Sequence, residues 1–167
     1  MSSQRDQLLA AAHAFCDAFA AQKPLDEILN HLANGEDTLC VEHGLQQLAP
    51  FLGRQFAGPD GVKRYFTIIA DLLSYDNMIF SEYFADAETQ MVSVKGTATF
   101  TWKDTGNSWD EVFTYRLQFN DQLKVKVYEV WADSGAAYLA SRGELVGIVL
   151  YILHTYENIV TNPIKKE

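Results

Sequence analysis

The feature that most constrains the fold is the stretch Trp109–Asp133, in which apolar and polar residues alternate on both sides of a polar turn signal, Asn120-Asp121-Gln122. Such alternation around a turn is typical of a β-hairpin with one buried face. We therefore predict a long hairpin that turns at these three residues. Its apolar side chains share odd-numbered positions: Trp109, Phe113, Tyr115, Leu117, Phe119, Leu123, Val125, Val127 and Trp131.

Two carboxylates, Glu111 and Glu129, fall on the same parity as these apolar residues. A charge that points into a core is costly unless it lines a cavity or finds a partner. The predicted turn places Glu129 opposite Phe113 and Glu111 opposite Trp131, so the two acids become diagonal neighbours, roughly 7–8 Å apart at Cα. Aromatic walls and a like charge both raise the pKa of a carboxyl group, which brings it towards general acid–base use. The alternative is that one or both acids sit at the rim of the sheet, hydrated or paired with Lys or Arg.

The remaining pattern predicts an α+β protein with N-terminal helices packed on a curved, antiparallel sheet. Helical spacing predicts helices at 3–21, 24–34, 59–73 and 134–142, and period-two alternation predicts strands at 38–43, 78–86 and 92–103. Residues 44–58 have no clean period, so we expect irregular structure there, and Gly96 suggests a bulge or a bend.

His43 is a second candidate for proton transfer, because an unperturbed histidine titrates near neutral pH. Strand parity groups it with Leu39 and Val41, which we predict to face a pocket, and places Cys40 and Glu42 on the other face. A structural, hydrogen-bonded histidine is the alternative.

Composition narrows the classes of partner. A formal charge of −9 over 167 residues, with no basic cluster apart from Lys165-Lys166, argues against nucleic acid and anionic membrane. We expect one domain: a main body over residues 1–143 and a C-terminal apolar tail over 144–167. Within the tail, Leu145–Val160 is too short and too polar at its end for a membrane span, so we predict a pocket lid or a contact in a homodimer.

Several signals are absent from the sequence. The two cysteines form no CxxC motif, the four histidines lack ligand spacing, and there is no GxSxG, GxGxxG, P-loop or HExxH sequence. We therefore predict no metal and no disulfide framework. The N-terminus does not resemble a signal peptide, so a cytoplasmic, reducing location is expected.

The segment 56–66, FAGPDGVKRYF, resembles the F-x-G-x-x-x-[IV]-x-x-[FY]-[FL] start of the third helix in the SnoaL-like branch of the nuclear-transport-factor-2-like superfamily. Lys124-Val125 stands where that superfamily often has a Lys-Ile pair, and Asp133 stands where its last strand ends. The resemblance implies a cone-shaped fold with a deep apolar pocket. Related proteins include ketosteroid isomerases, polyketide cyclases, scytalone dehydratase and limonene epoxide hydrolase, most of which use no cofactor.

The sequence departs from two of these enzymes. The epoxide hydrolase needs an Arg beside an Asp on one strand, whereas Arg116 has the parity opposite to Glu111 and Glu129. Scytalone dehydratase uses a pair of histidines with an acid, and only His43 is well placed here. Fold alone does not choose among the remaining activities.

We therefore predict a cofactor-free enzyme of secondary metabolism, an isomerase, cyclase or dehydratase acting on a small hydrophobic carbonyl or polyphenolic compound. Glu129 or Glu111 would be the base, His43 the acid or partner, and Tyr115 the donor to a substrate oxygen. For Tyr115 the alternative is a core aromatic residue whose hydroxyl is hydrogen-bonded within the protein. Asp133 either joins the site or caps the following helix. The residues expected to hold the substrate are aromatic: Trp102, Trp109, Phe113, Trp131 and Tyr65. The alternative is a non-catalytic module of the same fold that binds a ligand or dimerises through its sheet.

Overall fold

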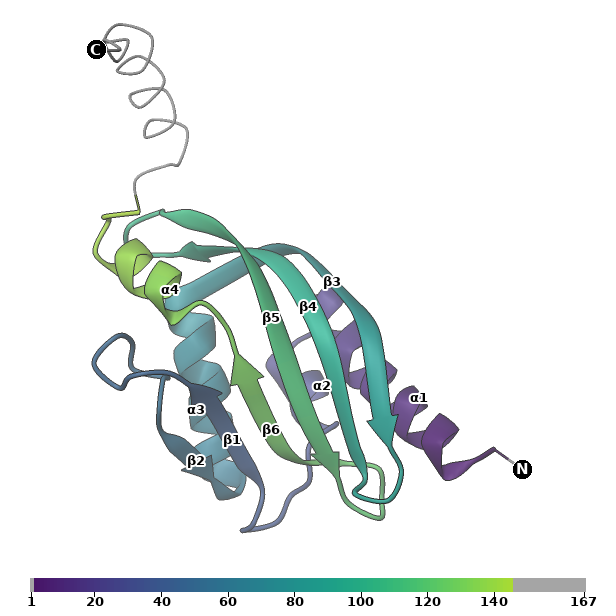
Figure 1. The fold of residues 1–167 in the computed structure, drawn as a ribbon. Coiled ribbons are helices and arrows are strands. Elements are labelled where there is room, and N and C mark those ends of the chain that lie inside the picture. Colours follow the sequence, from purple (N-terminus) through teal and green to yellow (C-terminus); the bar gives the residue numbers. More distant parts are fainter. Residues whose placement is uncertain (1, 146–167) are drawn as a thin grey trace, which may run out of the picture.

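The computed structural model describes residues 2–145, which form an α+β domain (Figure 1). Apart from Leu145, the predicted apolar helix over 145–160 lies outside the described residues, and so does its predicted role as lid or dimer contact. The described elements, in chain order, are helices α1 (Gln4–Ala20) and α2 (Leu25–Leu29), strands β1 (Leu39–His43) and β2 (Gln55–Ala57), helix α3 (Gly58–Leu72), strands β3 (Leu73–Asp86), β4 (Met91–Trp102), β5 (Ser108–Phe119) and β6 (Val125–Trp131), and helix α4 (Ser134–Ser141).

The strands form one six-stranded sheet in the order β2-β1-β6-β5-β4-β3. Neighbouring strands are antiparallel except for β1 and β6, which run parallel. The long strands β3, β4 and β5 twist and curve strongly, and the helices cover one face of the sheet (Figure 1). The predicted α+β class and curved sheet are confirmed; the short strand β2 and the parallel pair were not anticipated.

Local signals explain where the main helices begin. Ser3 and Asp6 form the predicted capping box at the start of α1, with each backbone N–H donating to the other side chain at 3.2 Å. At the start of α3, Gly58 has φ +69°, and a Cβ on Gly61 would lie 2.9 Å from the carbonyl carbon of Phe56. The glycines of the 56–66 motif thus permit a tight turn from β2 into α3.

The hairpin of β5 and β6 forms, but its predicted register is wrong. Phe119 pairs with Val125, whereas Gln118 pairs with Val127, so Lys126 is an extra residue on β6. This bulge reverses the parity of the strand, and beyond it the even-numbered Tyr128 and Val130 are buried. Glu129 therefore lies opposite Arg116 rather than Phe113.

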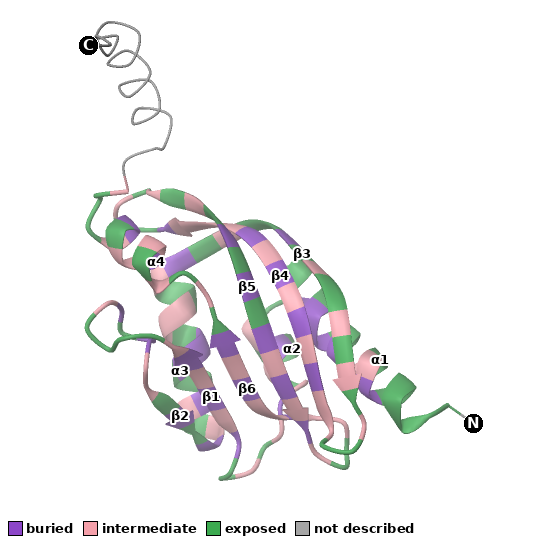
Figure 2. Cartoon of the chain, viewed as in Figure 1, coloured by how far each residue is buried: buried purple, intermediate pink, exposed green. Residues whose placement is uncertain are grey.

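The face predicted for β1 is also wrong. Cys40 and Glu42 are buried on the concave, helix-covered face, while His43 belongs to the opposite face together with Leu39 and Val41. The sequence pattern is followed closely on both strands: buried residues alternate with half-buried ones on β4 and mainly with exposed ones on β5 (Figure 2).

Gly96 is not a bulge within β4. It pairs with Phe113 of β5 in an unbroken ladder, and the irregularities of β3 lie on either side of its partner Phe80. A Cβ at Gly96 would lie 2.2 Å from the ring of Phe113. The glycine therefore provides the space in which this ring lies against the sheet.

Candidate active site

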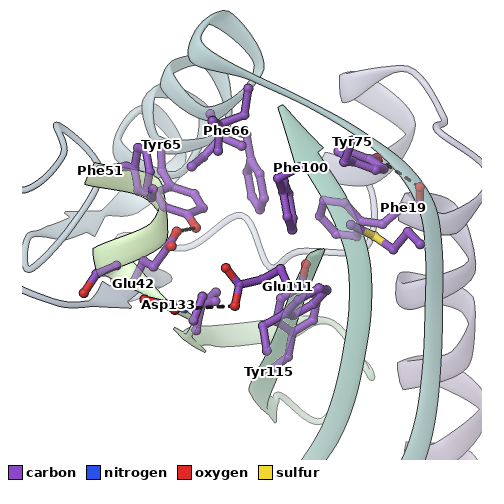
Figure 3. A pocket seen from close by; sticks show the side chains of 18 of the residues that line it. Phe19, Glu42, Phe51, Tyr65, Phe66, Tyr75, Phe100, Glu111, Tyr115 and Asp133 are labelled. Atoms are coloured by element: carbon purple, nitrogen blue, oxygen red, sulfur yellow. Dashed lines mark hydrogen bonds between the residues drawn. The ribbon is translucent and has the colours of Figure 1, made fainter. Parts of the chain in front are cut away.

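A cavity of about 70 Å³ lies between the concave face of the sheet and helices α1, α3 and α4 (Figure 3). Its walls are mainly aromatic, with rings from α1, α3 and four strands as well as from the loop before β2. The aromatic lining residues are Phe19, Phe51, Tyr65, Phe66, Tyr75, Phe100, Trp109, Phe113, Tyr115 and Tyr128. Three carboxylates also line it, those of Glu42, Glu111 and Asp133.

Glu42 reaches the cavity from β1. The Tyr65 hydroxyl of α3 donates a hydrogen bond of 2.7 Å to its Oε2 atom (Figure 3). Burial raises the pKa of Glu42 to about 7; the bond from Tyr65 opposes this change and the negative charge of Glu111 adds to it. Glu42 therefore changes its protonation state near neutral pH.

Glu111 reaches the cavity from β5, and its two oxygens already have donors. The indole N–H of Trp109 donates to Oε2 at 2.7 Å, and the backbone N–H of Asp133 donates to Oε1 at 3.0 Å. Burial raises the pKa of Glu111, while these two hydrogen bonds favour its ionised form. Two hydrogen bonds thus hold the position of the Glu111 carboxyl group, while burial keeps its pKa above the ordinary value.

Asp133 combines the two alternatives considered for it. Its Oδ1 atom accepts a 3.0 Å bond from the backbone N–H of Ala136, which caps α4, and the same residue lines the cavity. Its backbone orients Glu111, so the start of α4 is connected directly to the site.

The cavity tyrosines are hydroxyl donors. Burial raises the pKa values of Tyr65, Tyr115 and Tyr128 above the ordinary value for a phenol, so all three stay protonated at neutral pH. The rings of Tyr115 and Tyr128 are 4.9 Å apart, and Tyr128 also contacts Tyr65 at 5.9 Å. Protonated phenols can donate to a substrate oxygen or to a carboxylate.

Five of the predicted site residues line the cavity: Glu111, Tyr115, Trp109, Phe113 and Tyr65. Trp102 is buried but is not among the lining residues; its ring lies 6.5 Å from that of Phe51, which does line the cavity.

The pocket-facing positions predicted for Glu129, His43 and Trp131 are wrong, because the bulge in β6 and the parity of β1 place all three on the convex face of the sheet. There His43 Nε2 lies 3.2 Å from Glu129 Oε1, and Arg116 donates to Glu129 Oε2. The rings of His43 and Trp131 are stacked 4.2 Å apart. We call these four residues the convex cluster.

Sequence reasoning missed Glu42 and Tyr128. The burial of Glu42 could have been predicted from Cys40, which lies on the same face of the strand, since cysteine is among the most frequently buried residue types. For β6, Lys124 and Lys126 are polar at even positions and Glu129 at an odd one. That change of parity is what a bulge produces.

The described residues 2–145 contain no group of three or more His, Cys, Asp or Glu side chains that could hold a metal ion. Within the same range, no helix is long and apolar enough to cross a membrane.

No family model and no curated protein matches this sequence. Solved structures do match its fold. An NTF2-like protein of unknown function from Burkholderia pseudomallei superimposes with a TM-score of 0.68 at 18% identity, covering 84% of this chain and 98% of that one. A putative SnoaL-like polyketide cyclase from Jannaschia sp. gives 0.68 at 11% identity, covering 87% and 97%. BvnE pinacolase from Penicillium brevicompactum gives 0.60 at 14% identity, covering 92% and 97%.

The chain therefore has the nuclear-transport-factor-2-like fold. The fold expected from the 56–66 motif is confirmed.

Proposed function

We propose that this protein is an enzyme of small-molecule metabolism that transfers protons on a hydrophobic substrate held in the aromatic cavity. The reaction class would be isomerisation, cyclisation or dehydration, performed by side chains alone. The observation that carries the proposal is Glu42, a buried carboxyl group that faces the cavity, titrates near neutral pH and accepts a bond from a phenol. A group of this kind suits general acid–base catalysis.

The neighbouring groups have complementary roles in this proposal. Glu42 moves the proton, and Tyr65 stabilises its ionised form. Glu111, held by two donors, is the second carboxylate, either a base or a fixed negative charge. Two carboxyl groups in one cavity can divide the roles of acid and base when their surroundings give them different pKa values. Tyr115 donates to a substrate oxygen, while Trp109 and Phe113 hold the apolar part of the substrate.

The names of similar structures support a catalytic role. They include the pinacolase and the putative polyketide cyclase described above, and a putative isomerase from Bacillus subtilis. Each of these names is that of a catalytic activity. The cytoplasmic location and the homodimer remain predictions.

The proposal can be tested before the substrate is known, with 5-nitrobenzisoxazole as an activated aromatic carbon acid. A carboxylate removes its ring C–H proton, the N–O bond breaks, and the coloured cyanophenolate forms with no other reactant. We expect turnover that rises with a midpoint near pH 7, and a loss of at least about tenfold in Glu42→Gln or in Glu111→Gln.

Glu129→Gln is the matched control, because it makes the same change on the convex face, and its turnover should equal that of the unmodified protein. If the Glu42→Gln and Glu111→Gln proteins are folded and both retain full turnover, the acid–base proposal is wrong. The non-catalytic binding module would then be the better description.

A further inference from the structure

The charges that line the cavity are all of one sign. Glu42, Glu111 and Asp133 contribute carboxylates, and no lysine, arginine or histidine is found among the described residues that line it. Arg116 and His43 lie on the opposite face of the sheet, where they contact Glu129. An anionic ligand would enter this apolar space against carboxylates that have no cation beside them.

The second observation is the aromatic wall, which is independent of the acids. Aromatic rings come from several elements around the same space: Tyr65 on α3, Phe100 on β4, Trp109 and Tyr115 on β5, and Tyr128 on β6. The rings of Phe100 and Trp109 are stacked at 5.8 Å, and those of Tyr115 and Tyr128 meet edge-on at 4.9 Å. The ring of Phe113 lies 6.0 Å from that of Phe100 and 5.0 Å from that of Tyr115, so the wall is continuous. The face of an aromatic ring attracts a cation, most strongly in a desolvated site.

The third observation is an available acceptor. Glu42 Oε2 accepts the bond from Tyr65, whereas Oε1 has no hydrogen-bond donor among the described residues. In the same part of the chain, no fully buried side-chain oxygen lacks a partner. Oε1 is therefore not sealed in the protein, and because Glu42 lines the cavity it is available to a ligand.

From these three observations we infer that the cavity selects a ligand carrying a protonated or quaternary amine on an apolar skeleton. The aromatic faces surround the cationic centre, and Glu42 and Glu111 balance its charge. The inference depends on the proposed function only for the location of the site. It narrows the substrate class from hydrophobic compounds in general to nitrogen-containing cations. The formal charge of −9 also favours the approach of cations over anions.

Proton linkage gives this inference a distinctive signature. The titratable groups facing Glu42 are Tyr65, Glu111, Tyr115 and Tyr128. The phenols stay protonated through neutral pH, so they do not offset the change of charge at Glu42. Because Glu42 ionises with a pKa of about 7, a cation of fixed charge should bind about tenfold more tightly at pH 8 than at pH 6.

The test uses two probes of the same shape, benzyltrimethylammonium and neopentylbenzene, which differ in a single central atom and in charge. Calorimetry at pH 6 and pH 8 measures both. We expect the ammonium probe to bind at least about tenfold more tightly than the hydrocarbon at pH 8, with the pH dependence given above. The Glu42→Gln/Glu111→Gln variant should lose both the preference and the pH dependence.

Glu129→Gln and Trp131→Ala are the controls, because the convex cluster also combines an acid with an exposed aromatic ring. Neither should change the affinity for the ammonium probe. Equal or tighter binding of the hydrocarbon would overturn the inference, as would a preference that survives in the double variant. Because the binding measurement needs no turnover, it can be interpreted even if the benzisoxazole assay shows no activity. The benzisoxazole assay can likewise be interpreted if the ammonium probe does not bind.

Discussion

The two faces of the sheet hold carboxylates that are close in the fold but chemically different. Glu42 and Glu129 lie on the paired strands β1 and β6, where Val41 is the partner of Glu129 and Val130 the partner of Glu42. One step along the strand moves a side chain from the cavity to the convex face. The partners then differ in kind: neutral donors contact the acids inside, and a guanidinium and an imidazole contact the acid outside.

On the convex face, Glu129 contacts Arg116 and His43, whose side chains are 40% and 39% exposed. Opposite charge and nearby water both stabilise a carboxylate, so this arrangement is expected for a surface ion pair. On the concave face, Glu42 has a phenol and a neighbouring acid, and Glu111 has an indole and a backbone amide. The comparison indicates that the cavity keeps acids at a cost in stability, which is typical of a functional site.

The largest expected effect is a pH-dependent gain in stability on replacing Glu42. Its pKa is raised from 4.5 unfolded to about 7 folded, so the stability linked to its protonated form is fully present below pH 4.5 and is lost as pH rises through 7. Glu42→Gln removes this loss. Relative to the unmodified protein, its free energy of unfolding should rise by about 3 kcal/mol between pH 4.5 and pH 8.5.

Urea denaturation across this pH range measures the effect. A difference between the two proteins that stays constant from pH 4.5 to pH 8.5 would show that Glu42 does not titrate as a buried acid, and the contrast between the faces would lose its main support.

The next effect concerns packing on the concave face. Gly96→Ala places a methyl group against the ring of Phe113, which a Cβ would meet at 2.2 Å. Overpacking of this kind costs about 2 kcal/mol in stability and should also displace Phe113 into the cavity. The matched change on the convex face is Val112→Thr on the neighbouring strand, where the side chain is 64% exposed and the cost should be within about 0.5 kcal/mol.

Thermal or urea unfolding of the two variants compares the faces directly. Equal costs at Gly96 and Val112 would mean that the concave face is not packed as described.

A smaller effect is expected for Tyr65→Phe. The hydroxyl of Tyr65 lowers the pKa of Glu42 by donating to its ionised form, so its removal should raise the titration midpoint above 7 and cost about 1 kcal/mol at pH 8. Carbon NMR of the Glu42 carboxyl group measures the midpoint.

Tyr75→Phe is the control in the same cavity, because its hydroxyl donates instead to the backbone carbonyl of Phe19 at 2.9 Å. It should leave the midpoint of Glu42 unchanged. A midpoint that falls in Tyr65→Phe would contradict the direction of this hydrogen bond.

The sequence was sufficient to predict the fold and one half of the site. On β5, every odd residue from Glu111 to Phe119 is buried, as alternation required, so Glu111, Phe113 and Tyr115 were placed correctly. The capping box of α1 and the glycines of the 56–66 motif depend on local backbone geometry, which short patterns specify well.

The other half of the site was predicted wrongly, because the face on which each of its side chains lies depends on a shift of one residue along a strand. The extra residue Lys126 reverses the face of β6 and exchanges Glu129 for Tyr128 in the cavity. In β1, both faces carry apolar and polar residues, and the parallel pairing with β6 is a long-range contact that local alternation cannot specify. Glu42 was therefore assigned to the wrong face, although its chemistry fits the role predicted for Glu129.

The smallest expected effect is on the convex face, at the pair formed by Arg116 and Glu129. Because Arg116 is 40% exposed, water and salt screen the attraction, and a double-mutant cycle with Arg116→Gln and Glu129→Gln should give a coupling energy of about 0.5–1 kcal/mol at low salt. The coupling should shrink in 1 M NaCl, since the Debye length there is about 3 Å. A coupling that is several-fold larger and independent of salt would show that this face is dry in solution. The convex cluster would then belong to a buried interface. Glu129 would differ from the cavity acids in the charge of the groups that contact it and not in exposure to water.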